Sequence, residues 1–345
     1  LELGFQYLFG LSSNNSANPY VYIENDRVFG WEAKDPLIRL EQTGPPPYPY
    51  EDVGVMEKNY YSGASKAHAL YDNRMTGTII SGMAISWIKK NKNQPFFMYY
   101  AINLPHYPLQ PTDKWREYYK DLDMPRRDYA GFISVIDERV GELISYLDEL
   151  GLRENTIIIF QSDQGHSCES RAFGEGGNAG PYRGAKASLF EGGIRIPAIL
   201  NWPGHLPQGQ VNNTPAINYD WFPTIAELCG VTKIPDAVEG KSLLPVIEKN
   251  EAQHSSFRWK LGRQWAVREG DWKLLGNPTD PANKYPIRGE QDQVFLVNLA
   301  EDISESSNLA SQYPEKVEEL KKFRAPKNLW KKSPHFINQV IVKKY

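Results

Sequence analysis

The most regular pattern along the chain is a run of apolar residues between Arg127 and Leu150, spaced three or four positions apart. Its members are Tyr129, Phe132, Ile133, Ile136, Val140, Leu143, Ile144 and Leu147. Residues at this spacing share one face of a helix, so the run predicts a long amphipathic helix, and Gly151 is a typical stop after it. A similar run from about Asp72 to Lys90 predicts another helix earlier in the chain.

Three shorter, mainly apolar runs have the composition of buried strands. They are Phe96–Ile102, Thr156–Phe160 and Ile194–Trp202. Runs that are apolar on both faces are typical of central strands in a parallel sheet. Because the long helix lies between the first two runs, the order favours a crossover connection. We therefore expect an α/β fold, with a mostly parallel sheet sandwiched by helices.

The character of the sequence changes after about residue 244. A helix over Trp221–Leu228, with Asp220 as a candidate cap, is the last element of the alternating pattern. Two strand-like stretches and a terminal helix follow it, namely Gln264–Leu275, Val294–Leu299 and Pro314–Phe323. We therefore expect an α/β domain over residues 1–244 and a small α+β subdomain over residues 245–345.

Composition excludes several classes of protein. The chain has 345 residues, with 39 Lys and Arg against 42 Asp and Glu, so its charge gives no overall signature of nucleic-acid binding. No apolar run approaches the ~20 residues that span a bilayer. Cys168 and Cys229 are too few for a disulfide framework. The basic stretch 321–345 is best interpreted as a solvated end, and attraction of a polyanionic substrate is the alternative.

Polar residues follow the predicted strands at the edge where ligands bind in open sheets. Asp163 and Gln164 offer a carboxylate and an amide oxygen, which suit a hard cation such as Ca²⁺. An ordinary cap or turn is the alternative for both residues. Two residues cannot complete a calcium shell of ~6 oxygens, so other ligands would have to come from elsewhere.

Three further side chains are candidates for catalysis or substrate binding. His106 lies between two prolines that restrict the backbone, a suitable place for protonating a leaving group, and a plain surface histidine is the alternative. Lys186 follows a glycine-flanked turn and could hold an anionic group. His166 follows the candidate metal pair, where substrate contact and a structural hydrogen bond are both open.

Two other motifs do not support a site. Gly180–Lys186 resembles a phosphate loop only superficially, since its spacing is short and no Ser or Thr follows the lysine. Cys168 has no histidine partner that can be identified in the sequence, so a nucleophile is not assigned to it.

Several segments match one known family in the family's own order. They are Gly4–Gly10, Phe96–Tyr100 with Pro105–Pro108, Ile159–Gly165, Arg183–Lys186, Glu191–Ala198 with Trp202–Gly204, and Ala266–Leu274. Together they resemble the formylglycine-dependent (type I) sulfatases of the alkaline phosphatase superfamily. The resemblance covers most of the chain and implies an alkaline phosphatase-like α/β fold with a small C-terminal α+β subdomain.

The resemblance also implies roles for individual residues. Asp163 and Gln164 would be two ligands of the family's calcium ion. His106 would contact the sulfate and assist departure of the alcohol, and Lys186 would bind the ester and leaving oxygens. We expect His166 and Arg183 to be substrate-binding residues.

The family's nucleophile motif does not occur in this sequence. The family carries a Cys- or Ser-X-Pro-X-Arg motif that is converted to formylglycine, and Cys168 lacks the proline and arginine at that spacing. We therefore expect that an N-terminal portion with the formylglycine residue is missing from this chain. We also expect the chain alone to be inactive.

For the complete protein we expect a sulfuric ester hydrolase that acts on a sulfated carbohydrate or an aryl sulfate ester. A related phosphodiesterase or phosphonate hydrolase stays open, as does a non-catalytic sulfatase-like protein that binds glycans. A separate N-terminal fragment of the same protein is a candidate partner. The resemblance implies a periplasmic or secreted location, although no signal peptide is visible in the chain.

Overall fold

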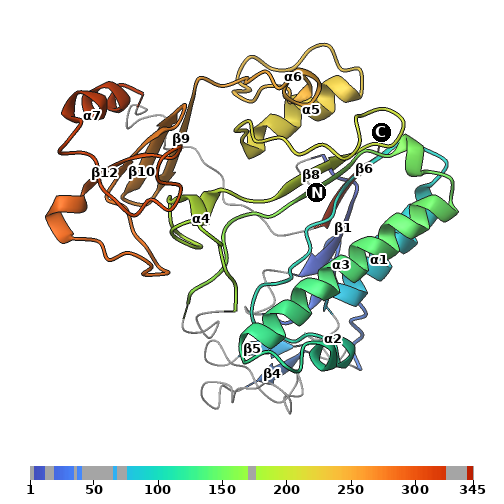
Figure 1. The fold of residues 1–345 in the computed structure, drawn as a ribbon. Coiled ribbons are helices and arrows are strands. Elements are labelled where there is room, and N and C mark those ends of the chain that lie inside the picture. The colour runs from blue at the N-terminus through green and yellow to red at the C-terminus, as the bar shows by residue number, and fades with distance from the viewer. Residues whose placement is uncertain are drawn as a thin grey trace. The chain divides into compact units, whose positions relative to one another are not determined.

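The computed structural model describes residues 4–11, 19–34, 37–40, 65–67, 76–169, 176–323 and 340–344. The chain forms two compact units, and Figure 1 shows their helices and strands, coloured along the chain. The first comprises residues 1–153, 167–177 and 334–345, and the second comprises residues 154–166 and 178–333. This division differs from the expected boundary after residue 244, because 154–166 and 178–244 fold together with the later strands.

The first unit contains a five-stranded sheet in the order β3-β2-β1-β13-β6. Its strands are β1 (Tyr7–Leu11), β2 (Tyr22–Glu24), β3 (Arg27–Val28), β6 (Phe96–Tyr99) and β13 (Val340–Lys344). All four neighbouring pairs run antiparallel. A separate antiparallel pair is formed by β4 (Ile38–Leu40) and β5 (Ser65–Ala67).

The first unit contains the helices α1 (Thr76–Asn91), α2 (Asp113–Tyr118) and α3 (Arg126–Glu149). Helices α1 and α3 confirm the two helical runs expected from the sequence. The inner face of α3 buries Phe132 and Val135 against Leu104 and Leu109. The last two side chains lie on either side of His106, so this core fixes both ends of the loop that carries the histidine.

The second unit contains a four-stranded antiparallel sheet in the order β12-β11-β10-β9. Its strands are β9 (Ser256–Leu261), β10 (Gln264–Glu269), β11 (Trp272–Gly276) and β12 (Val294–Asn298). The stretch Gln264–Leu275, expected to be one strand, is a hairpin of β10 and β11. Gly270 makes the tight turn possible because it adopts a φ of 57°, which side chains other than glycine disfavour.

Alternation along these strands divides the core of the second unit between the two faces of the sheet. Leu275 packs with Phe190 on one face, and Leu274 packs with Leu320 of α7 (Pro314–Lys321) on the other. Successive side chains of a strand point to opposite faces, so adjacent leucines serve different clusters. One face of the sheet therefore anchors the segment around Phe190.

The remaining elements of the second unit are short. They are η2 (Arg153–Asn155), β7 (Ile158–Gln161), α4 (Glu191–Ile194), β8 (Ala198–Asn201), η4 (Asn218–Asp220), α5 (Trp221–Leu228), α6 (Leu244–Lys249) and η5 (Gly289–Asp292). Helix α5 has the expected bounds. Asp220 does not cap it through its side chain, because the carboxylate instead accepts hydrogen bonds from the backbone N–H groups of Ile217 and Lys241.

The expected parallel pairing is not present among the described residues, where every strand pair is antiparallel. Strand β6 pairs with β13, and β7 pairs with β8 in a two-stranded sheet. Strands β6 and β7 belong to different units, so the crossover between Phe96–Ile102 and Thr156–Phe160 stays a prediction. Apolar composition predicts a strand, but it does not specify the partner or the direction of pairing.

Candidate active site

Two segments that are distant in the sequence lie against each other in the second unit. The first is 162–166, which follows β7, and the second is the turn 183–195, which contains α4. The Gly165 N–H donates to the Gly193 carbonyl at 3.1 Å, and the Lys186 N–H donates to the His166 carbonyl at 2.8 Å. These two backbone hydrogen bonds join the segment that carries the predicted metal ligands to the turn that carries the predicted catalytic lysine.

Glycines make this close approach of backbones possible. A Cβ on Gly165 would lie 2.0 Å from the Gly192 carbonyl oxygen. A Cβ on Gly192 would lie 2.4 Å from the Gly184 carbonyl oxygen, and one on Gly193 would lie 2.2 Å from that of Ser188. Any larger residue at these positions would have to push backbone atoms apart, which explains the paired glycines after Glu191.

Asp163 and Gln164 lie next to each other after β7. The Asp163 carboxylate is exposed, and its Oδ2 accepts a hydrogen bond from Gln164 Nε2 at 3.1 Å. The Ser162 hydroxyl donates to the Gln164 carbonyl at 3.0 Å and steadies the turn. A carboxylate and an amide oxygen fit Ca²⁺ in donor type. They are too few to complete a calcium shell, and within the described ranges no cluster of three or more His, Cys, Asp or Glu side chains could hold a metal ion.

Lys186 and His166 are half-buried, and the residues after Lys186 are attached to the neighbouring sheet. Gln264 Nε2 donates to the Ala187 carbonyl at 2.9 Å. The Ser188 hydroxyl donates to the Thr279 carbonyl at 2.8 Å. The lysine therefore lies on a turn that is held by the backbone on one side and by the β9–β12 sheet on the other.

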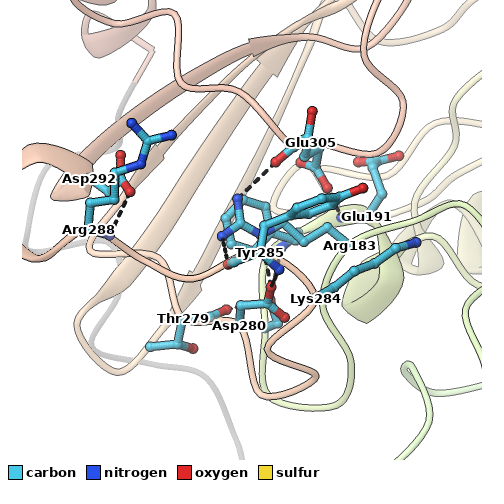
Figure 2. Close-up of polar contacts among 12 residues, drawn as sticks. Arg183, Glu191, Thr279, Asp280, Lys284, Tyr285, Arg288, Asp292 and Glu305 are labelled. Carbon is cyan, nitrogen blue, oxygen red and sulfur yellow. Dashed lines mark hydrogen bonds and ion pairs between the residues drawn. The ribbon is translucent and has the colours of Figure 1, made fainter.

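Arg183 does not have the exposure expected of a substrate-binding residue, since it is only 1% exposed. Its Nε donates to Asp280 Oδ2 at 2.9 Å, its Nη1 to the Glu305 carbonyl at 2.8 Å, and its Nη2 to the Tyr285 carbonyl (Figure 2). The guanidinium also lies over the Phe190 ring, 4.1 Å from its centroid. The structure corrects the expectation for Arg183, because this guanidinium fastens the turn to the later part of the unit.

A buried cluster of charges, which the sequence did not reveal, lies beside Arg183. Lys273 Nζ is 2.8 Å from Glu191 Oε1 and 3.0 Å from Glu305 Oε1, and all three residues are at most 2% exposed. Glu305 Oε2 accepts a hydrogen bond from the Glu191 N–H at 2.6 Å. We call Glu191, Lys273 and Glu305 the buried triad.

The two carboxyls of the buried triad titrate differently. Burial opposes ionisation of Glu191, but the charge and hydrogen bond of Lys273, with the charges of Arg268 and Arg195, hold its pKa below the ordinary value. Burial raises the pKa of Glu305 to about 7, and Lys273 only partly opposes this effect. Glu191 is therefore the ionised partner of Lys273, and Glu305 changes its charge near neutral pH.

His106 belongs to the first unit and lies on the loop between Leu104 and Leu109. The peptide bonds that precede Pro105 and Pro108 are both cis. His106 Nδ1 lies 2.8 Å from the Tyr107 carbonyl oxygen, which can only accept, so Nδ1 carries a proton. Nε2 is then the nitrogen whose protonation distinguishes the neutral ring from the cation.

The close contact at Gly165 leads to a prediction. We expect Gly165→Ala to destabilise the protein by about 3 kcal/mol or more, because the new methyl group meets backbone that cannot move away cheaply. Gly141→Ala is the control, since a Cβ there meets nothing within 4 Å and lies in α3, where alanine is favoured by about 1 kcal/mol. Urea denaturation measures both, and equal stability of the two variants would contradict the packing argument.

The titration of Glu305 leads to a second prediction. Its pKa in the folded protein lies above the ordinary value of 4.5, so its contribution to stability is full below about pH 4.5 and is lost as the pH rises through about 7. We expect Glu305→Gln to remove up to roughly 3 kcal/mol of this pH dependence. Denaturation of wild type and variant at pH 5, 6, 7 and 8 measures the difference. Glu301→Gln, at an exposed position, is the control.

Known proteins resemble both parts of the chain. A family model described as Sulfatase matches residues 2–231, and one described as N-sulphoglucosamine sulphohydrolase, C-terminal, matches residues 183–322. An N-acetylgalactosamine-6-O-sulfatase of Bacteroides thetaiotaomicron is 28% identical over 351 residues, covering 92% of this chain and 67% of that protein. The N-acetylgalactosamine-6-sulfatase of Mus musculus is 35% identical over 184 residues, covering 53% of this chain and 34% of that protein.

Solved structures show the same fold. A structure from work on glycosaminoglycan metabolism by Bacteroides thetaiotaomicron aligns with a TM-score of 0.71 and 24% identity, covering 92% of this chain and 72% of that one. The crystal structure of Ps i-CgsB aligns with a TM-score of 0.64 and 26% identity, covering 79% of this chain and 59% of that one. The likeness confirms the predicted alkaline phosphatase-like α/β fold class.

Within the described part of the chain, no helix is long and apolar enough to cross a membrane.

The chain covers only part of each relative, but a family model covers most of the chain. It spans about two thirds of the bacterial relative and about a third of the mouse relative. Residues 2–231 match the Sulfatase model, which is more than half of the 345 residues. The chain therefore belongs to the sulfatase family.

Proposed function

We propose that the protein to which this chain belongs is a sulfuric ester hydrolase that acts on a sulfated carbohydrate. The observation that supports the proposal is the contact between 162–166 and 183–195, in which the Lys186 N–H donates to the carbonyl of His166, two residues after Gln164. A cation and hard oxygen ligands at one place suit an anionic ester better than a neutral substrate. The relatives named as N-acetylgalactosamine sulfatases support a sulfated amino sugar as the substrate class.

In this proposal each side chain has a distinct task. The Lys186 ammonium holds oxygens of the sulfate ester and the leaving oxygen, and His166 contacts the substrate beside it. Asp163 and Gln164 hold a calcium ion, which supplies positive charge for the developing negative charge on sulfate. His106 gives a proton to the departing alcohol.

The nucleophile of the proposed reaction is not one of these residues. We propose formylglycine for this role, and no Cys- or Ser-X-Pro-X-Arg motif occurs among the 345 residues. We accordingly propose that these residues on their own release no sulfate. A non-catalytic protein that binds sulfated glycans is the second candidate function, and it applies if the 345 residues are the whole protein. A periplasmic or secreted location stays a prediction from the family.

The proposed site is tested by substitution in the full-length protein. We expect Lys186→Ala to lower kcat/KM on a sulfated N-acetylgalactosamine by about 10²–10³, because a cation aimed at developing charge is lost. Asp163→Ala should abolish the part of the activity that calcium restores after treatment with a chelator. Lys233→Ala, which changes an exposed lysine of the same unit, is the control and should behave as wild type.

Three outcomes of this test are informative. Wild-type activity in Lys186→Ala would refute the role of the lysine, and unchanged calcium dependence in Asp163→Ala would refute the metal assignment. If the wild-type protein binds the sulfated sugar by calorimetry without releasing sulfate, the non-catalytic function is favoured.

The role proposed for His106 predicts a dependence on the leaving group. General acid catalysis contributes typically ~10²–10⁴ in rate, so His106→Ala should lose about that much on a sulfated sugar. It should lose clearly less on nitrophenyl sulfate, because an activated phenol departs without a proton. Comparing kcat/KM of both substrates in wild type and variant measures the effect. An equal loss on both substrates would indicate that His106 only packs within its loop.

A further inference from the structure

One residue from the later part of the second unit, Glu305, holds the turn 183–195 at two points. Its main-chain carbonyl accepts the hydrogen bond from Arg183 Nη1 at 2.8 Å. Its carboxylate accepts the hydrogen bond from the Glu191 N–H at 2.6 Å. Arg183 and Glu191 lie on either side of Lys186 in the sequence, so Glu305 fixes the turn before and after the lysine (Figure 2).

The backbone of Glu305 adopts a conformation suited to this double contact. Its φ is 50°, in the left-handed region that residues with a Cβ disfavour, and its side chain is fully buried. The Glu305 N–H donates to the Asp302 carbonyl at 3.1 Å, and the Asp302 carboxylate accepts from the Ser306 and Ser307 N–H groups at 2.8 and 3.0 Å. The loop is therefore held in shape before it meets the turn.

Charge strengthens the same contact. Lys273, on β11, lies between the two carboxylates of the buried triad. Glu191 Oε2 has two further cations near it, with Arg195 Nη1 at 3.5 Å and Arg268 Nη1 at 3.6 Å. Removal of one partner from such a buried group leaves a charge without compensation. The position of Glu191 thus depends on Glu305 through both its backbone and its carboxylate.

We expect a displacement of Arg183 or Glu191 to shift Lys186, because backbone contacts close the turn between them. The Gly192 N–H donates to the Arg183 carbonyl at 2.6 Å, which closes the turn around the lysine. A Cβ on Gly192 would lie 2.4 Å from the Gly184 carbonyl oxygen, and one on Gly193 would lie 2.6 Å from that of Ala185, so the backbones on the two sides of Lys186 are closely packed. The Lys186 N–H in turn holds the His166 carbonyl, next to the proposed metal ligands.

We propose that Glu305 is a positioning residue for the reaction, which acts through Arg183 and Glu191 to fix the Lys186 ammonium relative to segment 162–166. The proposal rests on the proposed function of Lys186. Misplacing a catalytic group by about 1 Å can cost as much as 10²-fold in rate, so the effect belongs in kcat.

The experiment uses Glu305→Asp and Glu305→Gln in the full-length protein, with Glu301→Asp as the exposed control. Aspartate keeps the charge but is shorter by one methylene group, so it should lower kcat on the sulfated sugar about 10- to 100-fold and leave KM within about threefold. Glutamine keeps the length and an acceptor for the Glu191 N–H, but it removes the negative charge beside Lys273, so it should lower kcat less than aspartate does. All assays are run below the melting temperature of each variant.

The outcomes separate this proposal from a purely structural role and from the function on which it rests. A lower melting temperature of Glu305→Asp with wild-type kcat would overturn the positioning role. If Glu305→Asp does not fold, Arg183→Lys tests the same fastening, and wild-type kcat in that variant would overturn the proposal. Wild-type activity in Lys186→Ala refutes the proposed function, whereas loss in Lys186→Ala with none in Glu305→Asp refutes the positioning alone.

Discussion

The second unit depends on a group of charges that are entirely removed from water. Lys273 has carboxylates at 2.8 and 3.0 Å, and Arg183 has a carboxylate at 2.9 Å. Burying ions is costly, and attraction between them recovers the cost only when the geometry is good and the remaining polar atoms are hydrogen-bonded. Breaking such a group typically costs 3–5 kcal/mol. Segments far apart in the sequence must therefore come together correctly for the unit to be stable.

The site is assembled by contacts that act over long sequence separations, and this limits what the sequence could reveal. Helix α3 was predictable because its apolar residues repeat within a few positions of one another. Glu305 gave no such signal, because its contacts with Glu191 and Arg183 span 114 and 122 positions. The antiparallel pairing of β7 with β8 is not predictable for a related reason, since composition indicates a strand without specifying its partner.

Some candidate residues were found by motif, but their physical reasons became visible only in the structure. Gly192 and Gly193 belong to a segment that matched the family, and the structure shows that a Cβ at either position would collide with backbone. Asp163, Gln164 and Lys186 are each ambiguous in the sequence, and two backbone hydrogen bonds join the segments that carry them. Arg183 differs from its predicted role because its guanidinium is buried and holds the turn to Asp280, which the motif alone does not show.

Burial distinguishes residues of the same type that the sequence leaves indistinguishable. Lys186 is half-buried on a turn, whereas Lys273 is fully buried between two carboxylates. A cation that is neutralised by two buried carboxylates has little charge left for a substrate, but it holds the elements that carry it in fixed positions. A cation closer to solvent is available to an anionic ester. The difference in burial therefore separates a structural role for Lys273 from the catalytic role proposed for Lys186.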